Sequence, residues 1–369
     1  MTYQYINRTP GPINSRPQKK FQNRTDEVDR HESASPWIGQ LAVVDIIQEA
    51  RTVRTFRLAC GQDKHIPFRF EAGQYVDLAF FIEGRKQQRS YSISSSADER
   101  RYIDVTINQE QGGLVSGHLF DCVKVRTLID VRGPLGRFTI DRQAVRSIVL
   151  LGAGVGVTPL VSMVRTLVAE SWPGSIHVLF GFRTEADGLF VQELTDLAHN
   201  HRNLSVHTAW SRPVGRDHDH IGRVTSTLVR RLVRKLRAHT YYLCGPDQMM
   251  QDLHAGLQKF GVDESNIHTE AFGNSSSDSE LGGQYDLFFE GSGVRVMSRP
   301  GESLLQTAER VGVQVDYSCR TGTCGLCQVR LREGEVEMLR DDALTDEELE
   351  KGTILTCQSY PRTKCCLDQ

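Results

Sequence analysis

The chain has 369 residues, of which 39% are hydrophobic and 24% are charged, and its formal net charge is −2. This length exceeds one ordinary hydrophobic core and predicts two or three domains. The balanced charge excludes a global nucleic-acid footprint, which needs a basic face, and no apolar stretch approaches the roughly 20 residues of a membrane span.

The N-terminal segment, residues 1–36, is polar and contains Pro10, Pro12 and Pro17. It lacks the apolar core of a secretory signal, so we expect a flexible segment in a protein of the cytoplasm. The nine cysteines of so large a chain are not a disulfide scaffold. Free thiols beside a metal-type cysteine spacing fit the same reducing compartment.

Residues 37–140 contain short β-type runs separated by turn residues. We expect strands over 42–47, 52–59, 75–81, 89–94 and 102–107. Many short strands with charged or glycine-containing turns predict a small antiparallel β-barrel domain.

Residues 141–273 change to alternating strands and helices, which predicts a parallel α/β domain. A buried-type strand at 147–151 leads into a glycine-rich turn and a helix at 159–169, for which we expect Thr158 as the cap. Further strands are expected at 176–182, 204–210 and 241–244, and further helices at 191–198, 226–236 and 248–260.

A polar stretch at 274–283 has the composition of a flexible linker. Beyond it, residues 284–369 predict strands at 285–290, 294–298 and 328–331 and a helix at 303–310. Thr345 with Glu348 three residues later forms a capping box for a second, short helix.

The cysteine motif carries the most specific chemistry. Residues 319–327 spell CRTGTCGLC, so Cys319, Cys324, Cys327 and the later Cys357 have the C-x4-C-x2-C…C spacing of a [2Fe-2S] site. Gly322 and Gly325 let the loop fold around a cluster. The alternatives are a structural zinc site and unliganded cysteines. Structural zinc usually uses two separated knuckles, and Cys357 has no neighbouring knuckle partner.

On these residues, 284–369 resembles a plant-type [2Fe-2S] ferredoxin domain, and the resemblance implies a β-grasp fold. It implies that Cys319, Cys324, Cys327 and Cys357 are the cluster ligands. We expect Cys357 at the start of a strand. The last strand departs from the family pattern because it contains Lys364-Cys365-Cys366.

Two glycine-containing motifs and one arginine motif precede the ferredoxin part. The stretch Arg89-Ser90-Tyr91-Ser92 is followed by Gly112-Gly113 before a short expected helix, and by GPLGRF at 133–138. A flavin needs a cation for its pyrophosphate, a hydroxyl or aromatic group at its ring, and free amides at a helix start. The glycine turn at 152–159, GAGVGVTP, follows a strand and opens a helix, as in dinucleotide sites. It departs from G-x-G-x-x-G, and Arg183 stands where an acidic residue is usual.

This succession resembles the ferredoxin–NADP reductase family over 37–273. The resemblance implies FAD rather than FMN, with Arg89 at the phosphates, Ser90 in the same motif, and Tyr91 and Ser92 at the ring. It places Gly112, Gly113, Leu114, Val115 and Ser116 along the pyrophosphate. For the nicotinamide nucleotide it implies Gly154, Gly156, Thr158 and Cys244-Gly245-Pro246. It adds Phe272 over the flavin and Glu270 near the reacting atoms, so that the implied catalytic group is Ser92, Cys244 and Glu270.

The choice of nucleotide stays open between NADH and NADPH. Ser211-Arg212 follows the expected strand at 204–210, where NADPH-using relatives often carry such a pair. Gly222-Arg223-Val224 resembles the NADH-using oxygenase reductases, and we therefore expect NADH. His218 and His220 lie in a loop without a further ligand group, which favours a surface turn over a metal site.

Together these motifs predict an enzyme that passes electrons from NAD(P)H through FAD and a [2Fe-2S] cluster to an electron-acceptor protein. We expect the reductase component of a Rieske-type or di-iron oxygenase. The alternatives are the reductase of a hybrid-cluster protein, a redox sensor with incidental turnover, and a stand-alone flavin reductase, which would leave the cluster unused. An acidic run between Asp341 and Glu350 either steers a basic partner or is a solvated face.

Overall fold

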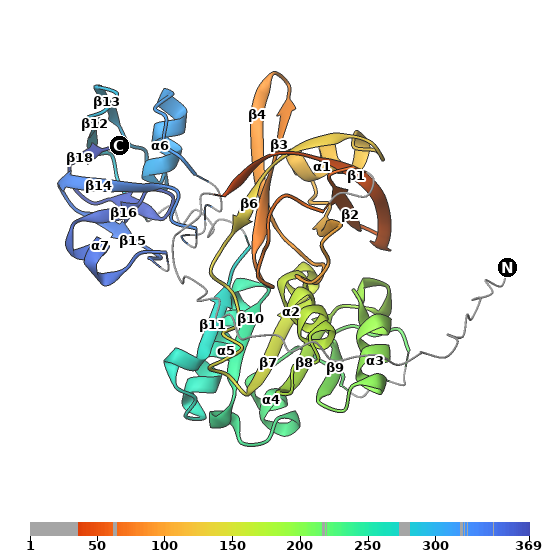
Figure 1. Ribbon diagram of the computed structural model, residues 1–369. Helices are drawn as coiled ribbons and strands as arrows, with labels where there is room; N and C mark the ends of the chain where they lie inside the picture. Colours follow the sequence, from red (N-terminus) through yellow and green to blue (C-terminus); the bar gives the residue numbers. More distant parts are fainter. Residues whose placement is uncertain are drawn as a thin grey trace, which may run out of the picture. The chain divides into compact units, whose positions relative to one another are not determined.

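The computed structural model describes residues 36–61, 65–215, 218, 220–272, 281–317, 320, 322, 324–341 and 343–369. The segment at 1–36 and the linker at 274–283 therefore fall largely outside the described residues. Three main sheets follow one another along the described chain, as expected (Figure 1). Within these ranges, no helix has both the length and the apolar character of a membrane span.

The first sheet is antiparallel and has six strands in the order β4-β3-β6-β1-β2-β5. An antiparallel bridge between Ile93, directly after β4, and Val105 in β5 joins the two outer strands of this order, so the sheet closes on itself as the expected barrel. Helix α1 (Leu114–Asp121) contributes Val115 and Leu119 to its interior. The strands are β1 (Trp37–Ala50), β2 (Val53–Ala59), β3 (Tyr75–Ile82), β4 (Arg85–Ser92), β5 (Tyr102–Asn108) and β6 (Leu128–Leu135).

The second sheet has five parallel strands in the order β11-β10-β7-β8-β9. Its two faces bury different cores, one with α2 and α3 and the other with α4 and α5, because successive strand residues point to opposite faces. The chain moves outward from β7 to β9 and then returns to β10, so a topological switch point lies between β7 and β10. The elements are β7 (Ser147–Ala153), α2 (Val157–Ala169), β8 (Ser175–Phe182), α3 (Val191–Asn200), β9 (Leu204–Trp210), α4 (Ser226–Leu232), β10 (Thr240–Cys244), α5 (Asp247–Lys259) and β11 (Ile267–Glu270).

Two expected helix boundaries in this domain were wrong. A 3-10 turn over Gly154–Gly156 runs directly into α2, so Gly156 is the cap and the Thr158 hydroxyl instead donates to the Val155 carbonyl (2.9 Å). Helix α4 stops at Leu232, four residues before the expected end, because Val233 turns to extended backbone and buries its side chain in the core. Tertiary packing of a β-branched residue has overridden the helical pattern.

The third sheet has the order β13-β12-β18-β14-β16, and β15 pairs separately with β17. The capping box of Thr345 and Glu348 on α7 is confirmed. The unexpected Cys365 lies in β18 and is fully buried in the core, where burial raises the pKa of its thiol to about 11; it therefore acts as a small apolar residue. The elements are β12 (Asp286–Phe289), β13 (Val294–Met297), α6 (Leu304–Val311), β14 (Gln328–Glu333), β15 (Val336–Met338), α7 (Asp346–Glu350), β16 (Thr353–Leu355), β17 (Ser359–Pro361) and β18 (Cys365–Asp368).

Helix α2 also packs against the barrel, on the segment 94–97 that follows β4. Three of its side chains hydrogen-bond to that segment: Ser162 Oγ donates to Ser95 O (2.7 Å), Arg165 Nη1 donates to Ser94 O (2.6 Å), and Thr166 Oγ1 accepts from Ala97 N (2.9 Å). Arg165 pairs in addition with Glu193 of α3 (2.6 Å). The helix that begins at the glycine turn is thus fastened to the segment that follows Ser92.

The Arg165 contacts predict a measurable contribution to stability. Replacing Arg165 with Ala leaves the Glu193 carboxylate and the Ser94 carbonyl without this donor. We expect the free energy of unfolding, measured by urea denaturation of the holoprotein, to fall by about 2 kcal/mol, between the values for exposed and buried pairs.

The control is Arg142→Ala, which removes the more exposed pair with Glu170. That variant is expected to lose less than about 1 kcal/mol. Equal losses for the two variants would contradict the role given to Arg165.

Candidate functional site

The end of β4 presents the expected flavin motif. Ser92 is 6% exposed, and its hydroxyl has no hydrogen-bond partner among the residues that the structure describes. A buried hydroxyl normally has a partner, so this one fits a polar ligand atom. Tyr91 is half-buried, and burial raises the pKa of its phenol, which therefore stays neutral.

The other two residues of the motif differ from each other. The Ser90 hydroxyl donates to the buried carboxylate of Asp77 (2.7 Å) and so supports the strand pair β3–β4. Arg89 is exposed, and its guanidinium donates to the carbonyl of the preceding Gln88 (2.7 Å). Its charge is therefore accessible to an anionic ligand.

The start of α1 offers a second feature suited to an anion. Gly112 has a φ of +73°, and Gly113 caps the helix without a side-chain hydrogen bond. The amides of Leu114 and Val115 therefore have no side-chain cap and suit phosphate oxygens. Ser116 is buried, and its hydroxyl accepts from the Glu110 amide (3.1 Å).

At the switch point of the parallel sheet, two strand ends meet without room for a side chain. A Cβ on Gly156 would lie 2.6 Å from the carbonyl oxygen of Cys244 and 2.6 Å from the Cα of Gly245. Only glycine allows this approach. The turn after β7, which includes Gly154, is thereby held against Cys244-Gly245 at the end of β10, and Pro246 caps the following helix α5.

Cys244 and Glu270 are register partners at the ends of β10 and β11, and both are buried. Burial, reinforced by the charge of Glu270, raises the pKa of the Cys244 thiol well above its ordinary value. The thiol is therefore neutral and offers a small, uncharged wall. Thr158 is buried on the adjacent α2. Phe272 is 43% exposed, so its aromatic ring is accessible to a ligand.

The cysteine loop is only partly described, because Cys319 lies outside the described residues. Cys327 and Cys357 share one buried cluster, and the amide and hydroxyl of Thr356 both donate to the Cys327 carbonyl (3.0 Å each). Cys357 follows the end of β16 and does not start a strand, which corrects the sequence expectation. The Thr356 hydrogen bonds explain why the chain turns there.

The loop backbone also suits a cluster. Gly322 and Gly325 adopt φ angles of +81° and +73°, the left-handed region that glycine favours. Among the described residues no three His, Cys, Asp or Glu side chains form a metal-binding group. Cys319, one of the four expected ligands, lies outside these residues.

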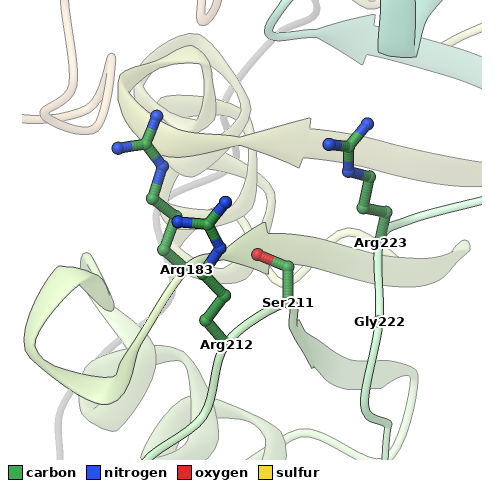
Figure 2. Close-up of a pocket in the computed structure, with 5 residues that line it drawn as sticks. All are labelled: Arg183, Ser211, Arg212, Gly222 and Arg223. Atoms are coloured by element: carbon green, nitrogen blue, oxygen red, sulfur yellow. The ribbon is translucent and has the colours of Figure 1, made fainter.

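A pocket of about 380 Å³ lies at the ends of β8 and β9 and is rich in arginine. Its lining residues are Arg183, Ser211, Arg212, Gly222 and Arg223. Figure 2 shows the side chains of Arg183, Ser211 and Arg212 at this pocket, and Arg223 on a separate segment.

The sequence pointed to Ser211-Arg212 as a possible phosphate-binding pair and noted Arg183 and Gly222-Arg223 separately, but it did not predict that they line one pocket. Arg183 and Arg223 lie 29 residues before and 11 residues after Arg212 in the chain, so local spacing could not join them. A usable signal was present: Arg183 and Arg212 each directly follow a strand of the parallel sheet, and such strand ends share one edge of a sheet. Glu185 was missed as well. Its carboxylate accepts from the amides of Val214 (3.1 Å) and Gly215 (2.9 Å) and so fixes the loop after Arg212.

Comparison with known families matches all three parts of the chain, in order. Residues 40–140 match the oxidoreductase FAD-binding domain, 150–255 the oxidoreductase NAD-binding domain, and 287–362 the 2Fe-2S iron-sulfur cluster binding domain.

Comparison with individual proteins extends the match over most of the chain. The glycine betaine monooxygenase reductase subunit of Pseudomonas aeruginosa is 30% identical over 88% of this chain and 93% of its own length. An NADPH oxidoreductase of Mycobacterium tuberculosis is 32% identical over 82% of this chain and 77% of its own. Among solved structures, phthalate dioxygenase reductase aligns with a TM-score of 0.63 and 25% identity, covering 90% of this chain and 98% of that one.

The contact between Gly156 and Cys244 generates a test. In Gly156→Ala the new methyl group must push the end of β10 away, and we expect about 1–3 kcal/mol of destabilisation. Because the turn then no longer sits against Cys244, we expect the KM for the nicotinamide nucleotide to rise on the order of tenfold. Thermal unfolding and steady-state kinetics measure the two effects.

Gly117→Ala is the matched control, because a Cβ at this helical glycine meets nothing within 4 Å. It is expected to be neutral or stabilising by up to about 1 kcal/mol. If both variants kept the wild-type KM, the close approach would have no role in nucleotide binding.

Proposed function

Because this chain belongs to the family of NAD(P)H-dependent iron–sulfur flavoprotein oxidoreductases, we propose that it is the reductase component of an oxygenase. The chain uses FAD, NAD(P)H and a [2Fe-2S] cluster, and its partner is a redox protein. The observation that carries the proposal is an alignment that covers 93% of the length of a relative named as a monooxygenase reductase subunit. The partner we propose is a separate Rieske-type or di-iron oxygenase.

For the flavin we propose the residues at the end of β4 and the start of α1. Arg89 pairs with the pyrophosphate, together with the amides of Leu114 and Val115, and Gly112, Gly113 and Ser116 shape the turn that presents them. Tyr91 contacts the ring, and the unpartnered Ser92 hydroxyl hydrogen-bonds to it. Ser90 does not contact the flavin through its hydroxyl, because that hydroxyl donates a hydrogen bond to Asp77; it supports the strand that carries Tyr91 and Ser92.

For the nicotinamide nucleotide we propose the turn at Gly154–Gly156 and the facing residues Cys244 and Glu270. The turn receives the pyrophosphate at the start of α2. Thr158, Cys244 and Glu270 position the nicotinamide ring, with the neutral thiol supplying an apolar wall. Phe272, which is exposed, would cover the flavin.

For the cluster we propose four thiolate ligands, Cys319, Cys324, Cys327 and Cys357. When bound, FAD would supply the acceptor for a hydride, and the [2Fe-2S] cluster would supply one-electron transfer. The chain's own contribution is to hold the loop, through Thr356 on the Cys327 carbonyl and through the two left-handed glycines.

The acidic run on the ferredoxin part is proposed as the partner-docking surface. Asp341, Asp346, Glu347 and Glu350 are exposed. Glu348 has a different role, because its carboxylate caps α7 and hydrogen bonds from Thr345 lower its pKa. A docking test must therefore leave Glu348 intact.

Removal of a cluster ligand tests the electron path. In Cys324→Ser we expect the broad cluster absorption to be lost and cytochrome c reduction to be abolished, while NAD(P)H still bleaches the flavin bands. Cys366→Ser, in β18 of the same domain, is the control and keeps both activities. Undiminished cytochrome c reduction by Cys324→Ser would show that electrons leave from the flavin, and the proposed path would be wrong.

Charge reversal tests docking. For Glu347→Lys combined with Glu350→Lys we expect reduction of cytochrome c, a basic acceptor, to slow by roughly three- to tenfold at low salt, since exposed charges act mainly on the association rate. Reduction of ferricyanide should not change. Glu333→Lys with Glu335→Lys makes the same charge change on another exposed part of this domain. If this control slowed cytochrome c equally, the effect would be net charge and not a docking surface.

A further inference from the structure

We propose that the arginine pocket at the ends of β8 and β9 binds the 2′-phosphate of NADPH, and that Arg183, Arg212 and Arg223 make this chain selective for NADPH. The inference deepens the proposed function and rests on it in one respect, the use of a nicotinamide nucleotide. It departs from the NADH expected from Gly222-Arg223-Val224.

The charge of the pocket requires an anion. Three guanidinium groups and the Ser211 hydroxyl line it, and among the described residues that line it there is no carboxylate. In the described part of the chain none of these three arginines forms an ion pair, whereas Arg165 of the same domain is paired with Glu193. Like charges in one pocket repel one another, and a doubly charged phosphate monoester removes this repulsion while accepting hydrogen bonds from the guanidinium forks.

The place of the pocket in the sheet identifies which phosphate this is. A dinucleotide lies across the carboxyl ends of parallel strands at the switch point. With its pyrophosphate on the turn after β7 and its nicotinamide beside Cys244 of β10, its adenosine half extends the other way, towards β8 and β9. Arg183 follows β8 and Ser211-Arg212 follows β9, so the pocket meets the adenosine ribose.

The walls of the pocket are held in place by the chain itself. The amide of Ser211 donates to Phe182 O (3.0 Å), that of Arg212 to Arg183 O (2.8 Å), and that of Gly222 to Trp210 O (2.8 Å). These three bonds fasten the three segments that carry the arginines. The Glu185 carboxylate fixes the loop beyond Arg212 through the Val214 and Gly215 amides, and these hydrogen bonds lower the pKa of Glu185 to about 2. Little reorganisation is then needed on binding.

NADH lacks the group that this pocket requires. NAD-specific sites usually carry an acidic residue for the ribose 2′-hydroxyl near the end of the second strand; here Arg183 occupies that end. A neutral 2′-hydroxyl would leave the three positive charges uncompensated. NADH should therefore bind, through its shared pyrophosphate and nicotinamide, but more weakly.

The test measures flavin reduction by stopped flow in the holoprotein, with NADPH and NADH, for wild type, Arg183→Gln, Arg212→Gln and Arg223→Gln. Each substitution should raise the Kd for NADPH by about 10- to 100-fold, the range for one lost charge-assisted hydrogen bond, and change that for NADH by less than about threefold. Arg202→Gln, an exposed arginine outside the pocket, is the control and should change neither. Equal losses for NADPH and NADH would overturn the proposal.

A second measurement separates this pocket from the proposed function. Calorimetry of the holoprotein with adenosine 2′,5′-bisphosphate and with 5′-AMP probes the pocket without any electron transfer. Selective binding of the bisphosphate, lost in Arg212→Gln, supports the pocket even if neither nucleotide reduces the flavin, in which case the proposed function alone fails. Equal binding of the two probes by wild type overturns the pocket, and flavin reduction by both nucleotides would then leave the proposed function standing.

Discussion

The arrangement of the nucleotide-binding half depends on the absence of a side chain at Gly156, where the backbone meets the carbonyl of Cys244. This approach brings the turn after β7 next to Cys244 and Glu270 at the ends of β10 and β11. The same glycine caps α2, and α2 in turn hydrogen-bonds to the segment that follows Ser92. One steric constraint thus links the proposed nicotinamide site to the proposed flavin site.

The two ends of the proposed nucleotide site differ sharply in charge. At the proposed nicotinamide end the Cys244 thiol is buried and neutral, because burial raises its pKa. At the adenosine end three arginines are exposed around one pocket. In the proposed site, recognition and reaction therefore use opposite electrostatic environments on the same sheet edge.

Local signals in the sequence were sufficient for most of the fold. The strand at 204–210 and the capping box of Thr345 and Glu348 have the expected bounds and contacts, since each depends on neighbouring residues alone. Helix α4 ended early because the core holds Val233, a tertiary effect that periodicity cannot report. The placement of Arg183 and Arg212 in one pocket likewise could not be predicted without the strand order, which puts β8 beside β9.

The central claim is that electrons enter from a nicotinamide nucleotide and leave through the cluster. An anaerobic absorbance titration of the as-purified protein with NADPH tests it most directly. We expect the flavin bands to bleach first and the broad cluster absorption to be lost afterwards. If flavin and cluster bands are both present and neither NADPH nor NADH changes them, the claim is contradicted.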